Sequence, residues 1–429
     1  LLSIFNKILE SLVNKRLLSF LNKHDILFQN QFGFRTKHST MHAALSITDK
    51  VQKSIEEGQY SCGIFLDFSK AFDTVDHKIL LQKLRNYGIR GIALDWFASY
   101  LSNRRQFVTI GNTSSDVRSL SHGVPQGSVL GPLLFLIYIN DFNRSSTFFD
   151  FHIFADDSNL FLSNHSIFEL ERLANDNLYL VSNWLRANKL SLNIEKTNFI
   201  IFHPPQKKLS YTPKLTISNK RIKQENYVKY LGLYIDSSLS WKFHVQHIAK
   251  KVKRCAGILS KIRYYVTKDI LVQLYYALVY PFLAYSLITW GNTYSTTLKP
   301  LTILQKRIAR IINFADFNAH SSPIFANLGI LKLEDLIFLD NALFMHDYYS
   351  NQLPSVFSNF FKSVSEVHHY NTRLASKNKY YLPKARTNYG KFNIRFSGTK
   401  VWNSLEDDIK SMNRYLFKKN LKLFLLSKY

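Results

Sequence analysis

The sequence predicts an α+β fold followed by a helical region, and three observations support this. An apolar run at residues 61–66 has the composition of a short buried strand, and a helical pattern follows it. Two apolar stretches, 148–153 and 159–162, flank a short acidic turn, which predicts a β-hairpin. From Trp241 onward the apolar residues recur mainly at helical spacing. We therefore expect strands alternating with helices over 61–240 and helices beyond it.

Composition bounds the class of protein. The chain has 429 residues, enough for two or three domains, and its 46% hydrophobic content excludes global disorder. Lysine and arginine outnumber aspartate and glutamate by 56 to 30, a net charge of +26, which indicates a polyanionic partner, most simply nucleic acid. The two cysteines, Cys62 and Cys255, cannot form a zinc site by themselves and suggest a reducing compartment. No secretory signal is visible.

The first predicted strand ends at a carboxylate. The chain begins at Leu1 without an initiator methionine, and residues 1–60 are predicted to be helical. The strand at 61–66 then ends at Asp67, and a helix follows. A carboxylate in this position lies where open α/β sheets bind their ligands. Alternatively Asp67 caps the helix, unless Ser69 does so and leaves Asp67 free.

A glycine-rich turn follows an inserted portion. Residues 85–120 are predicted to contain a helix around 96–101 and a hairpin of 107–110 with 117–120. After it, Pro125 and Gly127 shape a tight turn, and Ser128 can cap an apolar helix. Gly127 allows a ligand to approach the backbone closely, and Gln126 offers both a donor and an acceptor beside it. A plain turn before a helix is the alternative.

Two adjacent carboxylates, Asp156 and Asp157, form the tip of the predicted hairpin. Such charges repel by roughly 1 kcal/mol in water at 4 Å and about 4 kcal/mol near a protein surface. A solvated turn is the ordinary explanation for a lone pair of aspartates. Together with Asp67, however, they give the minimal set for two-metal phosphoryl transfer, and Mg²⁺ prefers such oxygen ligands. We expect Asp73, Asp76 and Asp141 to cap helices or orient loops.

The remaining elements are mostly helical. Residues 166–188 predict a long amphipathic helix and 196–202 a strand. The uncharged stretch 270–298 is long enough to cross a membrane, but its polar residues favour a buried helix that bends or ends near Pro281. Around 245–263 and 301–312 the helices carry lysines and arginines that would suit nucleic-acid phosphates, or would simply be solvated. Beyond 346, interleaved cations and aromatics suit single-stranded RNA or short packed elements.

Three segments in this order resemble the palm motifs of reverse transcriptases of the non-LTR (LINE-type, jockey-like) retrotransposon family. They are Phe65 to Asp73, Gly123 to Ser128, and Phe154 to Asp157. Flanking segments resemble the fingers signature, the fourth palm motif, the primer grip and, with weaker specificity, the C-terminal tail: Gln31 to Arg35 with Ser39-Thr40, Leu192-Asn193 with Lys196-Thr197, Tyr230 to Gly232, Arg386 to Gly390, and Val401 to Leu405. The resemblance covers residues 1–240 at the level of motifs.

The resemblance implies a right-hand polymerase, an α+β fold in which the palm carries an antiparallel sheet and the fingers and thumb are helical. Its domains would be partial fingers at 1–60, a palm at 61–240 with a fingers insertion at about 85–120, a thumb at 241–345, and a basic aromatic C-terminal segment at 346–429. Relatives start further upstream, so the chain is expected to be an N-terminally truncated fragment or element copy.

The resemblance also implies a metal site. Asp67, Asp156 and Asp157 would be the metal-binding catalytic triad, with the backbone carbonyl of Phe68 as a further ligand. The cofactor would be Mg²⁺, with Mn²⁺ as an alternative. Phe72 would stand as a steric gate that excludes the ribonucleotide 2′-OH, unless it is only a core residue.

Three further contacts follow from the same resemblance. Gln126 and Gly127 would border the incoming nucleotide and the template. Arg35 would contact the triphosphate, unless it forms a surface ion pair. Lys196 would protonate the leaving pyrophosphate, unless it is merely solvated.

The implied function is an RNA-directed DNA polymerase that extends a primer 3′-OH with dNTPs in retrotransposon replication. Its partners would be an RNA template and a DNA primer, with no membrane and no identifiable partner protein. The family implies an intracellular protein of nucleus and cytoplasm, although no targeting signal is visible. A DNA-templated polymerase is one alternative. An inactive or co-opted nucleic-acid-binding fragment is the other.

Overall fold

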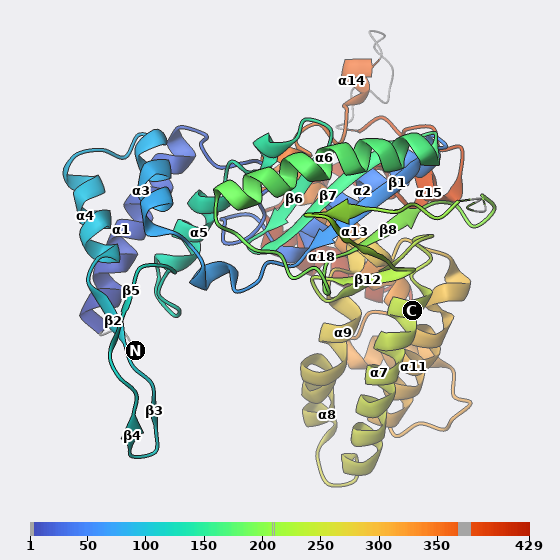
Figure 1. Cartoon of the computed structure of the whole chain (residues 1–429). Helices are drawn as coiled ribbons and strands as arrows, with labels where there is room; N and C mark the ends of the chain where they lie inside the picture. Colours follow the sequence, from blue (N-terminus) through green and yellow to red (C-terminus); the bar gives the residue numbers. More distant parts are fainter. Residues whose placement is uncertain (1–3, 208, 210, 368–378) are drawn as a thin grey trace. The chain divides into compact units, whose positions relative to one another are not determined.

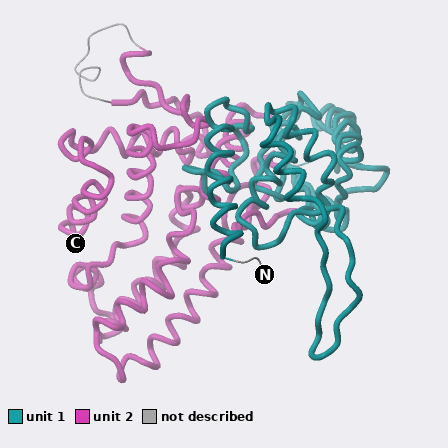
Figure 2. The backbone as a smooth tube through the Cα atoms, turned by 90° about the vertical axis from the view of Figure 1, so that its left-hand side faces the viewer, with its two compact units in different colours: residues 1–39, 60–201, 208–225 teal, residues 40–59, 202–207, 226–429 magenta. Residues whose placement is uncertain are grey.

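The computed structural model describes residues 4–207, 209, 211–367 and 379–429. These residues form two compact units, coloured separately in Figure 2. Unit 1 consists of residues 1–39, 60–201 and 208–225, and unit 2 consists of residues 40–59, 202–207 and 226–429.

Unit 1 is built on a five-stranded sheet with the strand order β11-β8-β1-β7-β6 (Figure 1). The five strands are β1 (Tyr60–Leu66), β6 (Asp150–Phe154), β7 (Asp157–Asn164), β8 (Asn198–Phe202) and β11 (Lys223–Gln224). All seven residues of β1 are buried, which explains its uninterrupted apolar run. Strands β6 and β7 form the predicted hairpin, and β7 also pairs antiparallel with β1.

Helices form most of the rest of unit 1. They are α1 (Ile4–Lys23), α3 (His77–Asn86), α4 (Ile92–Leu101), α5 (Gly131–Ile139) and α6 (Ile167–Ala187). Helix α5 is apolar all round and almost wholly buried, so it forms the centre of the unit 1 core. Helix α6 lies across the sheet in Figure 1, and the Ser166 hydroxyl caps it by accepting a bond from the Glu169 N–H at 3.4 Å.

The helix after Asp67 begins later than the sequence suggested, so neither Asp67 nor Ser69 caps it. A 3₁₀ turn, η1 (Ala71–Asp73), comes first, and α3 starts at His77. The cap is Asp76, whose carboxylate accepts bonds from two backbone N–H groups at 2.9 and 3.0 Å. Asp67 is therefore free of capping, and the structural role expected for Asp76 is confirmed.

The smaller elements of unit 1 lie in loops. The predicted hairpin in the insertion is confirmed in outline as a ribbon of two short strand pairs, which projects in Figure 1. Its strands are β2 (Arg104–Gln106), β3 (Thr109–Ile110), β4 (Thr113–Ser114) and β5 (Arg118–Leu120). The other short elements are η2 (Phe142–Ser145), β9 (Thr216–Ile217) and β10 (Lys220–Arg221).

Unit 2 combines α2 (Thr40–Glu56) with the C-terminal half of the chain. A two-stranded sheet of β12 (Tyr227–Tyr230) and β13 (Leu233–Asp236) leads into α7 (Lys242–Ile262). Helix α7 packs along α11 (Ser295–Ile312), and both were expected from their helical spacing.

The uncharged stretch 270–298, together with the two residues before it, is broken into short helices. They are α8 (Lys268–Leu274), the π-helical segment η3 (Tyr275–Val279), α9 (Tyr280–Ala284) and α10 (Leu287–Trp290). The chain leaves the helical conformation at Tyr285, four residues after Pro281. Among the described residues, no helix is long and apolar enough to cross a membrane.

The C-terminal elements pack within unit 2. They are α12 (Ser321–Leu328), α13 (Leu333–Tyr349), η4 (Ser355–Phe357), α14 (Val364–Val367), α15 (Asn388–Phe392), α16 (Ile394–Ser404), α17 (Asp407–Lys410) and α18 (Arg414–Leu426). Helix α2 packs against α15 and α10, so residues 40–59 group with unit 2 rather than with 1–39. The expected division into fingers, palm and thumb remains a prediction.

Candidate active site

The sheet register brings two of the three predicted carboxylates to one end of neighbouring strands. Leu66 on β1 pairs with Ser158 on β7, so Asp67 follows one strand where Asp157 begins the other. Phe154 pairs with Asp157 across the hairpin, which leaves Ala155 and Asp156 as a two-residue turn. Asp156 therefore lies at the same edge of the sheet, although 89 residues separate it from Asp67 in the sequence.

These carboxylates interact electrostatically. The pKa of Asp157 is raised from 3.8 to about 6, mainly by partial loss of hydration and in addition by the negative charges of Asp156 and Asp67. Asp156 and Asp157 keep an open face toward solvent, whereas Asp67 is half-buried. The edge of the sheet thus holds a coupled group of three acids.

A divalent cation suits the chemistry of this donor set, because all three side chains offer hard carboxylate oxygens and their mutual repulsion needs a counter-charge. As the side chains stand, no three His, Cys, Asp or Glu residues in the described part of the chain gather tightly enough to hold a metal ion. The ligand types therefore fit a divalent metal, while its coordination remains a prediction.

The segment that resembles the fourth palm motif braces Asp67 through the backbone. The Asn193 N–H donates to the Asp67 carbonyl at 2.8 Å, and the Asp67 N–H donates to the Thr197 hydroxyl at 3.3 Å. Phe68 forms an isolated antiparallel bridge with Leu192. The sequence indicates this segment only by its resemblance to the fourth palm motif. The bond between Asp67 and Thr197 could not be predicted, because residues 130 positions apart leave no local pattern.

Lys196 lies in the same bracing segment. It is solvent-exposed, and its backbone N–H donates to the Asn193 carbonyl at 3.2 Å. Its ammonium group is thus available to solvent one residue before Thr197, which bonds Asp67. Its role toward pyrophosphate remains a prediction.

The glycine-rich turn packs against the segment after Asp67. The Val124 N–H donates to the Phe72 carbonyl at 2.9 Å, and the Gln126 side-chain amide donates to the Asp73 carboxylate at 2.9 Å. Gly127 has a φ of +79° and open space where a Cβ would lie. The conformation therefore requires glycine here and leaves its backbone accessible to a ligand.

Phe72 lies between the core and the site. Its ring is half-buried and packs against the Phe135 ring of α5, with 4.5 Å between the centroids. This packing is compatible with both roles considered for Phe72, because a half-buried ring has a second face to offer a ligand.

A polar cavity of about 800 Å³ opens beside these residues. Its lining contains three lysine or arginine residues and one acid, Asp73. The lining residues are Lys70, Asp73, Arg104, Arg105, Gln106, Ser119, Leu120, Ser121, His122, Gly123, Val124, Pro125 and Gln126. The sequence analysis missed Arg104 and Arg105, although an adjacent arginine pair next to a predicted hairpin was a visible signal. The cavity brings them to the predicted nucleotide-contacting Gln126.

Arg35 is held by its own loop. One guanidinium nitrogen donates to the Phe28 carbonyl at 2.7 Å and to the Gln31 carbonyl at 3.3 Å. Burial lowers the pKa of Arg35, and the charge of Asp25 opposes that shift. The guanidinium therefore has a structural task, and its contact with a triphosphate remains a prediction.

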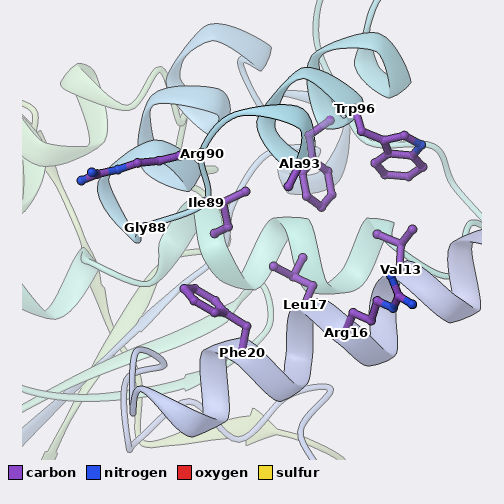
Figure 3. A pocket seen from close by; sticks show the side chains of 10 residues that line it. Val13, Arg16, Leu17, Phe20, Gly88, Ile89, Arg90, Ala93 and Trp96 are labelled. Carbon is purple, nitrogen blue, oxygen red and sulfur yellow. The ribbon is translucent and has the colours of Figure 1, made fainter.

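A second cavity of about 400 Å³ in unit 1 is lined mainly by apolar side chains (Figure 3). Its lining is Val13, Arg16, Leu17, Phe20, Gly88, Ile89, Arg90, Ala93, Trp96 and Phe97. None of these residues belongs to the predicted site, which lies at the ends of β1 and β7.

The carboxylate group at the sheet edge and the similarity of the sequence to known proteins together assign this chain to a protein family. The family model described as reverse transcriptase (RNA-dependent DNA polymerase) matches residues 1–235. The chain therefore belongs to the reverse transcriptase family.

Two of the relatives are described as polymerases of mobile elements. The probable RNA-directed DNA polymerase from transposon BS of Drosophila melanogaster is 27% identical over 360 residues, which cover 79% of this chain and 38% of that protein. The RNA-directed DNA polymerase from mobile element jockey of the same species is 27% identical over 346 residues, or 78% of this chain and 37% of its own length. The chain thus spans less than two fifths of these relatives.

Among solved structures, a telomerase from Candida albicans with a fragment of telomeric RNA aligns with 85% of this chain and 57% of its own. The TM-score is 0.42 and the identity 13%, a similarity too low to define the fold. The mixed helix and sheet of the described residues agree with the predicted α+β class.

Proposed function

We propose that this chain is an RNA-directed DNA polymerase that extends a primer 3′-OH with dNTPs. One observation supports this most strongly: three coupled carboxylates lie at the edge of a buried sheet in a member of the reverse transcriptase family. The sequence similarity to non-LTR retrotransposon polymerases supports retrotransposon replication as the setting.

In this proposal Asp67, Asp156 and Asp157 hold two Mg²⁺ ions, with the carbonyl of Phe68 as a further ligand. Bound ions would activate the attacking hydroxyl and shield the charge on the transferred phosphoryl group. The protein's part is to hold three acceptor-only side chains at one sheet edge. The bonds from Asn193 and to Thr197 fix the backbone of Asp67 for that task.

The nucleotide would lie beside the glycine-rich turn. Gln126 and Gly127 would border the nucleotide and the template, and Phe72 would lie under the deoxyribose. Three cations of the polar cavity, Lys70, Arg104 and Arg105, would offer counter-charge for the phosphates of the template. Arg35 would contact the triphosphate, and Lys196 would donate a proton to the leaving pyrophosphate.

Unit 2 would hold the template–primer duplex. Helices α7 and α11 carry exposed cations, among them Lys250, Lys253, Arg254, Lys261 and Arg307. Contacts to phosphates need positive charge but no sequence code, which suits a polymerase that must move along any template.

Primer extension on matched templates tests this function against its alternatives. Wild-type protein is incubated with one DNA primer annealed to an RNA or a DNA template of the same sequence, with dNTPs and Mg²⁺. We expect extension on RNA. Extension on DNA alone would favour a DNA-templated polymerase, and binding of both duplexes without extension would favour an inactive nucleic-acid-binding copy.

A further inference from the structure

We propose that Gln31 is a positioning residue for the turn that carries Asp156, an inference that rests on the proposed function of that turn. Gln31 lies in the segment between α1 and α2 and is only 2% exposed. The proposal is that its side-chain amide sets the backbone geometry of the acidic turn without contacting substrate.

The side chain of Gln31 joins two backbone segments. Its carbonyl oxygen Oε1 accepts a bond from the Gly33 N–H at 2.9 Å and a second from the Ala155 N–H at 3.2 Å. Ala155 directly precedes Asp156 in the turn between β6 and β7. One buried oxygen thus ties the catalytic hairpin to a segment more than 120 residues away.

The backbone continues this contact. The Phe32 N–H donates to the Ile153 carbonyl at 2.8 Å, and the Ile153 N–H donates to the Asn30 carbonyl at 2.9 Å. Gln31 and Ile153 therefore form a short parallel bridge at the outer side of β6. The segment acts as an additional strand at the point where the turn begins.

Gly33 permits the close approach. A Cβ on Gly33 would lie 2.5 Å from the Ala155 nitrogen and 3.1 Å from the Phe154 carbonyl carbon, both backbone atoms that cannot move aside alone. Any side chain at this position would push the segment away from the turn. The glycine thus keeps the Gln31 oxygen within reach of the Ala155 N–H.

The turn needs this support. Ala155 has a φ of +55°, in the left-handed region that residues with a Cβ avoid. Such conformations persist where the surroundings fix them, and they are frequent at functional sites. The bond from the Ala155 N–H to Gln31 holds this conformation. It thereby sets the direction in which the side chain of Asp156 extends from the turn.

A neutral acceptor suits this position. A carboxylate would accept the same two bonds but would add negative charge next to three coupled acids. The Gln31 amide nitrogen Nε2 is buried with no hydrogen-bond partner among the described residues. The acceptor oxygen of the same amide, by contrast, is used twice, by the Gly33 N–H and by the Ala155 N–H of the turn.

The test replaces the acceptor without changing the size of the side chain. Gln31→Met keeps the volume but accepts no comparable bond, whereas Gln31→Glu keeps both bonds. Hydrogen exchange is measured by mass spectrometry, without metal, on the peptide 150–158 and on overlapping peptides whose difference isolates the Ala155 N–H. We expect at least tenfold faster exchange there in Gln31→Met, and near-native exchange in Gln31→Glu.

Kinetics supply the second readout. In primer extension we expect kcat of Gln31→Met to fall at least tenfold while the KM for dNTP stays within twofold, because the nucleotide contacts are untouched. If Gln31→Met does not fold, Gln31→Asn, whose side chain is too short to reach Ala155, replaces it with the same expectations.

Asn140 provides the matched control. It is also a buried amide and bonds the Phe28 N–H and the Ile26 carbonyl, each at 2.8 Å, without contacting the turn. Asn140→Leu should lower the melting temperature but leave exchange in 150–158 unchanged. Native exchange and kcat in Gln31→Met would overturn the proposal. A wild-type chain without polymerase activity would contradict the proposed function, while the exchange result would still decide the positioning role.

Discussion

At the scale of single residues, Phe72 separates a catalytic role from a purely structural one. Its ring packs on Phe135 yet remains half-buried. If the ring supports the deoxyribose, Phe72→Val should admit ribonucleotides with little loss of dNTP use. The free-energy difference by which the protein discriminates dNTPs from rNTPs should then fall by up to a few kcal/mol, the range of overpacking penalties. Single-nucleotide incorporation of dNTPs and rNTPs measures the change.

The structural role of Phe72 predicts a different result. Truncation of a core phenylalanine costs about 3–5 kcal/mol for Phe→Ala, and both activities would fall together. Phe97→Val, in the core of α4, serves as a control that should lower stability without changing sugar choice. Unchanged discrimination in Phe72→Val, together with a lower melting temperature, would assign Phe72 to the core.

Asp157 predicts a pH-dependent stability. Its pKa is raised to about 6 in the folded chain, compared with about 3.9 in an unfolded one, so the folded state binds the proton more tightly. Stability should therefore decrease as the pH rises from about 4 to 6. Asp157→Asn removes this loss.

Thermal unfolding in a chelator at pH 4 and pH 7 checks the effect. The melting temperature of Asp157→Asn should exceed that of wild type at pH 7 and match it at pH 4. Asp116→Asn, on the exposed hairpin, should show no such pH-dependent difference from wild type. An equal difference at both pH values would exclude the coupling.

Several residue roles could be predicted from the sequence, and others could not. Asp76 was expected to cap or orient, because Asp favours N-caps, and it does. Gln31 gave no local signal as a buried acceptor, because its partner Ala155 lies more than 120 residues away. The same reason hid the bracing of Asp67 by Thr197.

At the scale of elements, α7 and α11 predict a salt-dependent affinity for the primer–template. Each phosphate contact adds about 0.9 to the slope of log K against log salt. Lys253→Gln together with Arg254→Gln should therefore reduce the slope by up to about 2. Fluorescence anisotropy between 50 and 200 mM salt (about the range where such effects are large) measures it.

A matched control separates this from a general loss of charge. Arg172 lies on α6 and is paired with Glu169 and Asp176 at 2.6 and 3.1 Å. Arg172→Gln changes the net charge but should leave the slope unchanged. A flat salt response of the wild type would contradict the proposed role of both helices.

The C-terminal segment shows that charged and aromatic residues can serve packing instead of RNA. Arg395 bonds the buried Asp49 of α2 through Nε at 2.8 Å and Nη2 at 3.0 Å, and Trp402 is fully buried. Arg386 and Thr387 likewise bond Glu56, at the end of α2. For these residues the alternative of short packed elements is confirmed.

The Asp49–Arg395 pair predicts a large effect on stability. Breaking a buried pair costs about 3–5 kcal/mol, and the value here should be about 2–3 kcal/mol because Arg395 keeps a third of its side chain exposed. Asp49→Ala should lower the free energy of unfolding by that amount in urea titrations. Arg172→Ala, which breaks two exposed pairs, should leave it nearly unchanged.

Elements with strong periodicity were predictable, and those defined by distant contacts were not. The helices at 167–187 and 242–262 and the hairpin at the acidic turn follow from local spacing. Grouping of α2 with unit 2 depends on Asp49 and Glu56 meeting residues more than 300 positions later, which no local pattern reveals.

At the scale of the whole molecule, the net charge of +26 and the group of three carboxylates have complementary roles in the proposed DNA synthesis. The cations would hold the polyanionic template and primer, and the acids would concentrate negative charge where divalent ions are needed. The chain spans less than two fifths of the BS and jockey polymerases, so primer extension by this chain tests whether this part carries out that synthesis by itself.

The most direct measurement compares wild type with Asp156→Asn in primer extension on an RNA template, with duplex binding measured in parallel. Asn keeps the size of the side chain but removes one negative charge from the coupled group. We predict that extension falls by at least about a hundredfold, the scale of losing one electrostatic contact to the transition state, while duplex affinity stays nearly constant. Extension by Asp156→Asn at the wild-type rate would contradict the assignment of the active site.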